Sequence, residues 1–312
     1  MRAAVLRDYE LPPEAGEFDD PAPGDGSVVI DVSVAGINPV DLYTAAGSLP
    51  DKPPLPSVAG REGIGRFGGK RVYFDRPVAP FGSIAERALA QGDSLIEVPD
   101  GVDDGLAVSF GIAGLAAWLG LEWRGGLQEG ETVLVLGASS VFGQIAVQAA
   151  RLLGAGRVVA AARSEDGLER ARDELGADAV VRIDYDGDLT ARFREAAGGD
   201  VELVVDPIWG PAAVAALRAL GEGGRLVQIG NSAGPETEIP ARAIRTSIRS
   251  IIGHTNFSAP LEVKEAAFQA MCRRAAAGEL TVPVEELRLE DVSDAWRRQA
   301  EGPHKKLVVR LR

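Results

Sequence analysis

A short run of small residues at 137–143, Gly-Ala-Ser-Ser-Val-Phe-Gly, has the spacing of a turn that could bind phosphate. It follows the apolar run 132–136 and opens into a helical pattern. The predicted strand, tight turn and helix would direct the first N–H groups of the helix at an anion. We expect this anion to be the pyrophosphate of a nicotinamide dinucleotide, bound by Ser139, Ser140, Val141 and Phe142.

The run matches the dinucleotide-binding fingerprint G-x-G-x-x-G only in part. The three glycine positions hold Ala138, Ser140 and Gly143, so only the last glycine is present. Gly143 would let the helix pack close to the sheet, and the two smaller side chains still allow a phosphate to approach. An ordinary strand–helix turn in another kind of α/β protein is the alternative that this motif alone leaves open.

The residues after the second strand of such a unit select between NAD and NADP. An acidic residue there binds the ribose 2′-hydroxyl of NAD, whereas an arginine accommodates the 2′-phosphate of NADP. Here the acidic position is Ala162, followed by Arg163 and Ser164, and a guanidinium and a hydroxyl suit a phosphate. We therefore expect NADPH. Alternatively, Glu165 is the selecting residue and Arg163 a solvated surface charge, which would favour NADH.

The patterns around these residues predict an α/β protein with two kinds of domain. Residues 1 to about 110 are rich in Pro and Gly, with short apolar or alternating runs at 27–34, 71–74 and 84–88, which predicts a β-rich unit. Strands then alternate with helices, which is typical of a doubly wound parallel sheet. Its strands are expected at 132–136, 157–161, 179–182, 203–206, 225–229 and 250–253, and its helices start near Phe142, Asp166, Leu189 and Pro211.

The last part of the chain returns to helix and then to strand. Helical patterns cover 261–277 and 291–299, and a strand is expected at 306–311. Because a chain with β units at both ends usually pairs them, we expect one catalytic domain from residues 1–111 and 256–312. Residues 112–255 would form the inserted dinucleotide-binding domain.

The composition indicates a globular protein of about two domains. The chain has 312 residues, of which 46% are hydrophobic and 25% charged. A net charge of −13 argues against a nucleic-acid partner, since phosphate backbones need a basic face. The single cysteine, Cys272, excludes an internal disulfide and a cysteine-rich zinc lobe.

One uncharged stretch, residues 105–121, reaches the lower limit of a membrane span, which is about 17 residues. It contains several glycines and is flanked by acidic residues, so we expect a buried helix and no membrane partner. The first residues lack an apolar core long enough for a signal peptide. We therefore expect a cytoplasmic protein.

Several motifs spread almost from end to end carry a family resemblance. The most specific is 35–43, Ala-Gly-Ile-Asn-Pro-Val-Asp-Leu-Tyr, followed by Ala46-Gly47. Further matches lie at Pro56 with 60–65, at 69–72, at 82–86 and from 133 to 178. With these motifs the chain resembles the zinc-independent quinone oxidoreductases (the zeta-crystallin group) of the medium-chain dehydrogenase/reductase superfamily. The resemblance implies a GroES-like β-rich catalytic domain with a Rossmann domain inserted into it.

The resemblance also implies a set of catalytic residues. Asn38, Asp41 and Tyr43 would lie in one loop facing the nicotinamide. Asn38 would orient the substrate or the ribose, Asp41 would hold that hydrogen-bond network, and Tyr43 would line the pocket or donate to the substrate oxygen. The residues themselves leave open a turn-capping role for Asp41 and a packing role for Tyr43.

Further cofactor contacts are expected from the same resemblance and from the sheet. Tyr185 falls where the family has a tyrosine close to the 2′-phosphate. Gly230 and Asn231 end a late strand, where such sheets bind ligands. His254 could contact the nicotinamide, or be a structural histidine.

No metal site is expected. Zinc-dependent alcohol dehydrogenases have a cysteine ligand where this chain has Asn38 and a histidine ligand where it has Arg61. Asparagine is a weak zinc ligand and arginine is none. The structural zinc of that branch needs four cysteines, and this chain has one.

The activity implied by the resemblance is hydride transfer from NADPH to a small quinone or α,β-unsaturated carbonyl. Two alternatives remain: an enoyl-thioester reductase, and a catalytically silent NADPH-binding protein with a structural or sensing role. The family also implies a homodimer formed through the strand at 250–253, since an exposed edge strand can pair with a second chain.

Overall fold

The computed structural model describes residues 1–24, 26–50 and 52–312. The chain folds into two compact units. The first, the β-rich unit, contains residues 1–112 and 261–312. The second, the α/β unit, contains residues 113–260.

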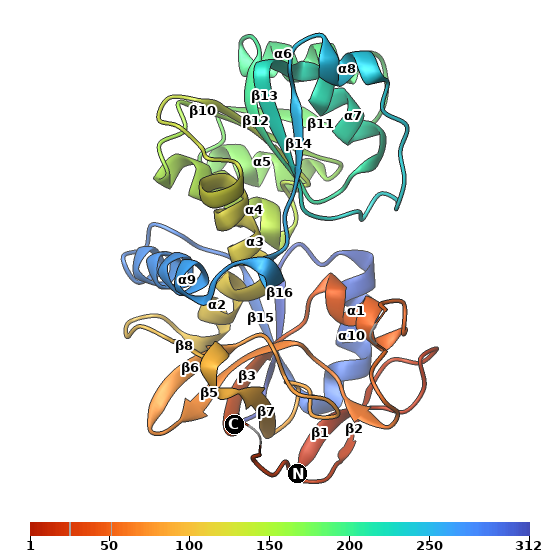
Figure 1. The fold of residues 1–312 in the computed structure, drawn as a ribbon, viewed down its shortest axis with the longest axis vertical. Coiled ribbons are helices and arrows are strands. Elements are labelled where there is room, and N and C mark those ends of the chain that lie inside the picture. Colours follow the sequence, from red (N-terminus) through yellow and green to blue (C-terminus); the bar gives the residue numbers. More distant parts are fainter. Residues whose placement is uncertain (25, 51) are drawn as a thin grey trace. The chain divides into compact units, whose positions relative to one another are not determined.

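The α/β unit is built on a six-stranded parallel sheet in the order β11-β10-β9-β12-β13-β14 (Figure 1). The strand order reverses between β9 and β12, which is the switch point of a Rossmann sheet. The predicted doubly wound sheet is therefore confirmed. Its strands are β9 (Thr132–Leu136), β10 (Arg157–Ala162), β11 (Ala179–Arg182), β12 (Val201–Asp206), β13 (Leu220–Gln228) and β14 (Ser250–Gly253).

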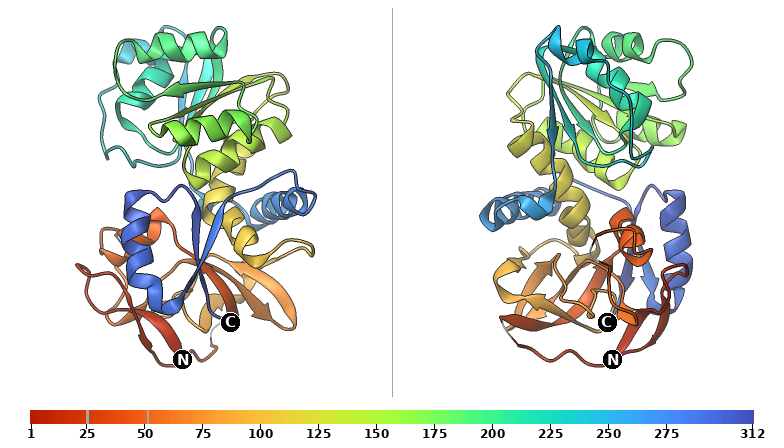
Figure 2. Two further views of the ribbon diagram at one scale, coloured as in Figure 1. Left: turned by 180° about the vertical axis from the view of Figure 1, so that it is seen from behind. Right: turned by 45° about the vertical axis from the view of Figure 1, so that its right-hand side comes forward.

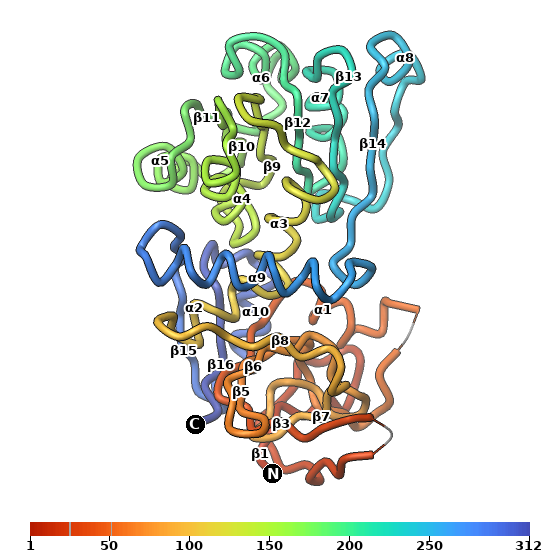
Figure 3. Tube along the Cα trace, turned by 60° about the vertical axis from the view of Figure 1, so that its left-hand side comes forward, coloured from red at the N-terminus to blue at the C-terminus, as the bar shows by residue number. Residues whose placement is uncertain are grey.

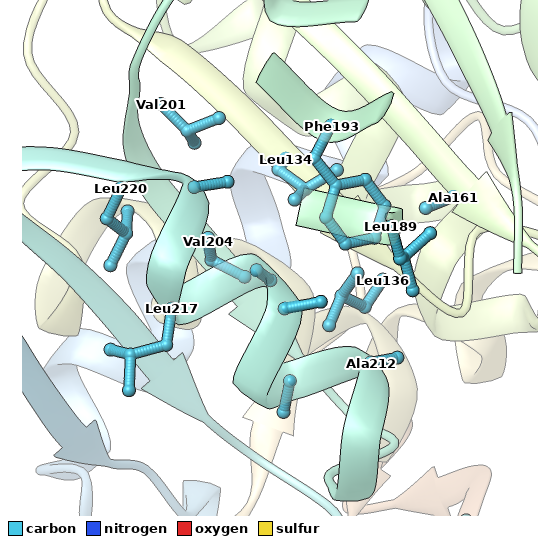
Figure 4. Packing of buried hydrophobic residues seen from close by; sticks show 14 of the residues in the cluster. Leu134, Leu136, Ala161, Leu189, Phe193, Val201, Val204, Ala212, Leu217 and Leu220 are labelled. Carbon is cyan, nitrogen blue, oxygen red and sulfur yellow. The ribbon is translucent and has the colours of Figure 1, made fainter. Parts of the chain in front are cut away.

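The core of this unit lies between the sheet and helices α6 (Leu189–Ala197) and α7 (Gly210–Ala219). In Figure 4 the fully buried Phe193 ring lies next to Leu189 and near Leu134. The strand residues that pack in this core are apolar, as expected for a parallel sheet covered by helices. The other helices of the unit are α3 (Leu115–Leu119), α4 (Val141–Leu152), α5 (Glu165–Asp173) and α8 (Ala241–Arg245).

The β-rich unit holds both ends of the chain. Strand β16, close to the C-terminus, pairs antiparallel with β3, close to the N-terminus (Figure 2). The main sheet has the order β15-β16-β3-β5-β6-β8, with β7 also paired to β3, and a smaller sheet has the order β2-β1-β4. The strands are β1 (Arg2–Leu6), β2 (Glu14–Glu17), β3 (Ser27–Gly36), β4 (Ser57–Val58), β5 (Glu62–Phe67), β6 (Lys70–Phe74), β7 (Arg87–Gln91), β8 (Ile96–Glu97), β15 (Val284–Arg288) and β16 (Lys306–Arg310).

The α-helices of this unit, within the residues described, are α1 (Pro39–Ala45), α2 (Asp104–Ser109), α9 (Leu261–Ala276) and α10 (Val292–Glu301). The chain leaves β14 and continues as α9, which Figure 3 shows as a long blue coil. Helices α1 and α10 share an apolar cluster that includes Ala45, Val292 and Trp296.

Two local predictions are wrong. The segment with Asn38, Asp41 and Tyr43 is not a loop, because a helix begins at Pro39, a residue suited to the first helical position. The strand expected at 84–88 begins only at Arg87. Ile84 is instead bonded to Ala4 and Ala59, so this part of the chain joins the smaller sheet before β7 joins the main one.

The uncharged stretch near residue 110 is a buried helix, as predicted. The helical run Asp104–Arg124 is long and apolar enough to span a membrane, but 72% of its most apolar window is buried inside the protein. Such burial is typical of a core helix of a soluble protein.

Candidate active site and cofactor site

The turn between β9 and α4 has the geometry of a phosphate-binding loop. Gly137 has a positive φ of 65°, and the Ser140 hydroxyl accepts the N–H of Gly143 at 3.1 Å, which caps the helix. The same hydroxyl donates to the carbonyl of Gly137 at 2.8 Å. The first turn of α4 has N–H groups without intrahelical acceptors, and these can bind an anion.

Gly143 is the position where only glycine fits. A Cβ on it would lie 2.3 Å from the carbonyl oxygen of Gly137 and 2.4 Å from Cα of Ala138. The helix therefore packs directly on the turn, which is the role the sequence predicts for this glycine. Ser139, Ser140 and Val141 are half-buried, and Phe142 is buried. These residues fit the pyrophosphate of a dinucleotide.

The end of β10 lies beside this turn. Ser164 caps α5 by accepting the N–H of Gly167 at 3.2 Å. A Cβ on Gly167 would lie 2.4 Å from Cβ of Ser139, so the start of α5 touches the phosphate-binding turn. Arg163, just before the cap, is exposed. The structure thus brings the residues expected at the pyrophosphate and those expected at the 2′-phosphate to one edge of the sheet.

A second arginine lies at the same edge. Ala162 of β10 is paired in register with Arg182 of β11, whose side chain is exposed. The guanidinium of Arg182 lies 3.9 Å from the carboxylate of Glu165. Tyr185, three residues further along, is half-exposed and has a positive φ of 62°. The charge of Glu165 is therefore partnered, while Arg163 adds a positive charge to this edge.

Gly230 and Asn231 lie at the other half of the sheet. They line a cavity of about 460 Å³ after β13, together with Trp209, Gln228, Ile229, Pro235, Ile251 and Gly253. His254 follows β14 and is buried, with Nε2 3.0 Å from the Asn256 side-chain oxygen. Burial lowers the pKa of His254, which keeps the ring neutral near pH 7.

The β-rich unit contains a buried polar cluster around Asn38. The Asn38 amide nitrogen donates to Glu62 Oε1 at 2.8 Å and to Asp41 Oδ2 at 3.3 Å. Its carbonyl oxygen accepts from the Lys306 ammonium at 2.7 Å, and the same ammonium bonds Glu62 Oε1 at 2.6 Å. Tyr73 Oη donates to Glu62 Oε2 at 3.1 Å. Each of these five side chains is buried.

Asp41 serves as a cap and is also an unusual acid. Its Oδ2 accepts the backbone N–H of Asn38 at 2.7 Å, so the capping role left open by the sequence is present. Its Oδ1 is buried and has no hydrogen-bond partner among the described residues. Burial and the charge of Glu62 raise the pKa of Asp41 to about 7. Near neutral pH this carboxyl therefore retains a proton in a large part of the molecules.

Tyr43 differs from its two neighbours in sequence. Its side chain is 46% exposed on α1, whereas Asn38 and Asp41 face the buried cluster. The structure therefore brings Asn38 and Asp41 together, and places Tyr43 on the surface of the same helix. A ligand can therefore reach the Tyr43 side chain from solvent. It cannot reach the buried Asn38 and Asp41 side chains unless the cluster rearranges.

The donor set at this position does not fit zinc. Asn38 stands at the position of the cysteine ligand of zinc-dependent alcohol dehydrogenases, and its side-chain oxygen is bonded to the Lys306 ammonium. Arg61 stands at the position of the histidine ligand, and its guanidinium lies 3.5 Å from the Thr44 hydroxyl. The described part of the chain contains no group of three or more His, Cys, Asp or Glu side chains arranged to hold a metal. A cation already bonded to both Asn38 and Glu62 opposes the binding of a second one.

Three members of the cluster were not predicted as site residues: Glu62, Tyr73 and Lys306. Glu62 stands between glycines in a motif of the family, but its place in the cluster depends on the ammonium of Lys306, which is 244 residues away in the chain. Lys306 opens the last strand and looks like a surface residue beside Lys305. The available signal was the run Lys306–Val309, in which a charged residue is followed directly by buried apolar ones.

Comparisons with known proteins agree with this architecture. A family model described as "Zinc-binding dehydrogenase" matches residues 142–273. The quinone oxidoreductase of Lama guanicoe is 30% identical over 78% of this chain and 75% of its own. The acryloyl-coenzyme A reductase of Metallosphaera sedula is 31% identical over 82% and 85%. The quinone oxidoreductase of Thermus thermophilus, also solved in complex with NADPH, superposes with a TM-score of 0.84 at 29% identity over the full length of both chains.

A Rossmann sheet inserted into a β-rich unit, with a capped phosphate-binding turn, defines a medium-chain dehydrogenase/reductase. Within this superfamily, the chain belongs to the quinone oxidoreductase family.

Proposed function

We propose that the protein is an NADPH-dependent oxidoreductase that transfers a hydride to a small quinone or α,β-unsaturated carbonyl without zinc. The observation that carries this proposal is the edge formed by the capped turn, Arg163, Ser164 and Arg182. It combines helix N-termini for a pyrophosphate with guanidinium groups for a further phosphate. The relatives named quinone oxidoreductase, one of them solved with NADPH, support it.

NADPH is favoured over NADH by the charges at this edge. Arg163 and Arg182 are both exposed there, and the carboxylate of Glu165 lies 3.9 Å from the guanidinium of Arg182. A 2′-phosphate can pair with these two guanidinium groups, whereas NADH offers no such group to them. Ser164 after β10 and the half-exposed Tyr185 after β11 add hydroxyl groups.

The proposed chemistry needs little from the protein beyond orientation. NADPH supplies the hydride when it is bound, and a conjugated acceptor can take it without a Lewis acid. Tyr43 carries the hydroxyl that can donate to the substrate oxygen as negative charge develops there. Asn38 and Asp41 hold α1, and therefore Tyr43, through the buried cluster.

An Arg163→Glu substitution tests the cofactor assignment. We expect it to raise the KM for NADPH by about tenfold or more and to leave the KM for NADH within about threefold, because it places a carboxylate against the 2′-phosphate. Arg172→Glu is the matched control, since Arg172 is an exposed arginine of α5 that bonds only its neighbour Asp173 among the described residues. Equal effects of both substitutions, or a wild-type preference for NADH, would contradict the assignment.

The substrate class is tested by NADPH oxidation with 9,10-phenanthrenequinone, a simple enone and acryloyl-coenzyme A. Turnover restricted to the thioester would favour an enoyl-thioester reductase. The relative named acryloyl-coenzyme A reductase supports testing this alternative. Binding of NADPH without turnover across the panel would favour a silent binding protein. We expect Tyr43→Phe to lower kcat several-fold, and complete loss would make Tyr43 an essential acid.

We further propose a cytoplasmic homodimer. Strand β14 is the last strand of the parallel sheet and has no neighbour on its outer side within the described chain. An exposed edge strand of this kind can pair with the same strand of a second copy. Sedimentation equilibrium is the direct test, and a monomer at all concentrations would refute the dimer.

A further inference from the structure

Among the described residues of the β-rich unit, Lys306 and Glu62 form the most deeply buried ion pair. Their side chains are 1% and 0% exposed, and the two atoms Nζ and Oε1 lie 2.6 Å apart. The two residues are 244 positions apart in the chain. A buried ion pair seldom adds stability over an apolar pair of the same shape, so its presence calls for another reason.

The backbone is shaped around this carboxylate. A Cβ on Gly36 would lie 2.7 Å from Glu62 Oε1 and 2.8 Å from Lys306 Cε. A Cβ on Gly111 would lie 2.2 Å from Glu62 Oε2. Two glycines from different segments thus leave the space that Glu62 and Lys306 fill, and larger residues would displace the pair.

The pair also determines how Asn38 is oriented. Glu62 Oε1 accepts from the Asn38 amide nitrogen, while Lys306 donates to the Asn38 oxygen at 2.7 Å. A reversed amide would place its NH₂ group against the ammonium and its oxygen against the carboxylate. Only one orientation is therefore compatible with the pair, and in that orientation the Asn38 nitrogen also reaches Asp41.

We propose that Lys306 is a positioning residue of the reductase. Its ammonium fixes the Asn38 amide and balances Glu62, and thereby holds the start of α1, which carries Tyr43, in its active arrangement. This inference rests on the function proposed above. Lys306 does not touch substrate or cofactor in it, and acts through Asn38.

The charges of Glu62 and Lys306 affect the titration of Asp41, which a change in packing alone would not alter in the same way. Glu62, Lys306 and Tyr73 are the ionisable groups next to Asp41, and α10, which packs on α1, presents apolar Val292, Ala295 and Trp296. Glu62 raises the pKa of Asp41 and Lys306 lowers it. Removing one charge or the other must therefore move the Asp41 titration in opposite directions.

The experiment compares Lys306→Met, Glu62→Gln and the double variant. In carbon NMR titrations of the Asp41 carboxyl we expect Lys306→Met to shift the midpoint upward by about one pH unit or more, and Glu62→Gln to shift it downward. We expect Lys306→Met to lower kcat by about tenfold or more with the KM for NADPH within about threefold, the pattern of a lost positioning contact.

Lys264→Met is the matched control. Lys264 forms the other buried ion pair of this unit among the described residues, with Asp75 at 2.9 Å and side chains 3% and 2% exposed. Its loss should lower the melting temperature as Lys306→Met does, but leave kcat within about twofold and the Asp41 midpoint unchanged, since it does not bond Asn38. Equal loss of kcat in both variants would show a merely structural role and overturn the proposal.

The double variant covers the case in which Lys306→Met does not fold. It removes both charges of the Lys306–Glu62 pair and so leaves neither of them buried without its partner, and it should recover the melting temperature. Its kcat should stay low, because the Asn38 oxygen has lost the ammonium that orients it, and full recovery of kcat would overturn the proposal. A wild-type protein without turnover on any acceptor would instead refute the proposed function. In that case, opposite shifts of the Asp41 midpoint in the two single variants would still support the contact of Lys306 and Glu62 with the cluster. Absence of these shifts would refute that contact.

Discussion

Replacing Asp41 with Asn tests whether the buried cluster holds an additional proton. The folded chain raises the pKa of Asp41 from 3.8 to about 7, through burial first and the charge of Glu62 second. The unfolded chain loses this proton near the ordinary value, while the folded chain keeps it to about neutral pH. In this window the folded state binds more protons, so the stability of the wild-type protein falls as the pH rises and levels off above about pH 7.

The size of the effect follows from the shift. A difference of about three pH units corresponds to about 4 kcal/mol of unfolding free energy. Asn keeps the shape of the side chain and an oxygen to accept the Asn38 N–H, which Asp41 accepts at 2.7 Å, but it cannot ionise. The variant should match the wild type in acid and exceed it at about pH 8. At about 2–4 °C per kcal/mol for a domain of this size, the gain in melting temperature is about 10 °C.

Thermal unfolding of both proteins between about pH 4.5 and 8.5 measures this difference. Of the 4 tryptophans, Trp296 is the one in the β-rich unit, so fluorine NMR of fluorotryptophan-labelled protein reports the unfolding of that unit separately. Asp173→Asn is the control, because Arg172 lowers the pKa of this exposed carboxyl and no gain at high pH is expected. A difference between Asp41→Asn and wild type that is constant across the pH range would refute the reasoning.

Three other predictions concern the rest of the molecule. Gly143→Ala should weaken NADPH binding by about tenfold or more in calorimetry, because its Cβ would lie 2.3 Å from the Gly137 oxygen, whereas Gly24→Ala, with open space around it, should bind normally. Asp206→Asn should stabilise the α/β unit against urea at about pH 7.5 but not at about pH 4. Burial raises the pKa of Asp206 to about 6, so the stability that the protonated carboxyl contributes is lost as the pH rises through that value. Cys272 should not react with Ellman's reagent until the protein unfolds, because burial raises its thiol pKa to about 12; fast reaction of the folded protein would contradict this.

The sheet of the α/β unit could be predicted closely because its signals are local. The strands β9, β11 and β14 begin and end at the predicted residues, since each is a short apolar run bounded by turn residues or charge. The turn after β9 follows from the small residues at 137–143 in the same way. Periodicity and glycine placement are properties of neighbouring residues, so one sequence suffices to read them.

The buried cluster could not be predicted because it depends on distance along the chain. Glu62 and Lys306 come together only when β16 pairs with β3 and β3 pairs with β5. Helix α1 was missed for a related reason. Its 7 residues are too few for a periodic signal, and the contacts that stabilise it come from α10 and from the cluster.

The two sets of site residues should therefore respond differently to substitution. The cofactor turn in the α/β unit binds through backbone N–H groups whose positions depend on Gly143, so its variants should change the Kd for NADPH first. The cluster in the β-rich unit contributes through the placement of α1, so its variants should change kcat at nearly constant Kd. Measuring both constants for Gly143→Ala and Lys306→Met separates these effects. A parallel change in both constants for both variants would mean that the cluster and the turn form one coupled site rather than two independent contributions.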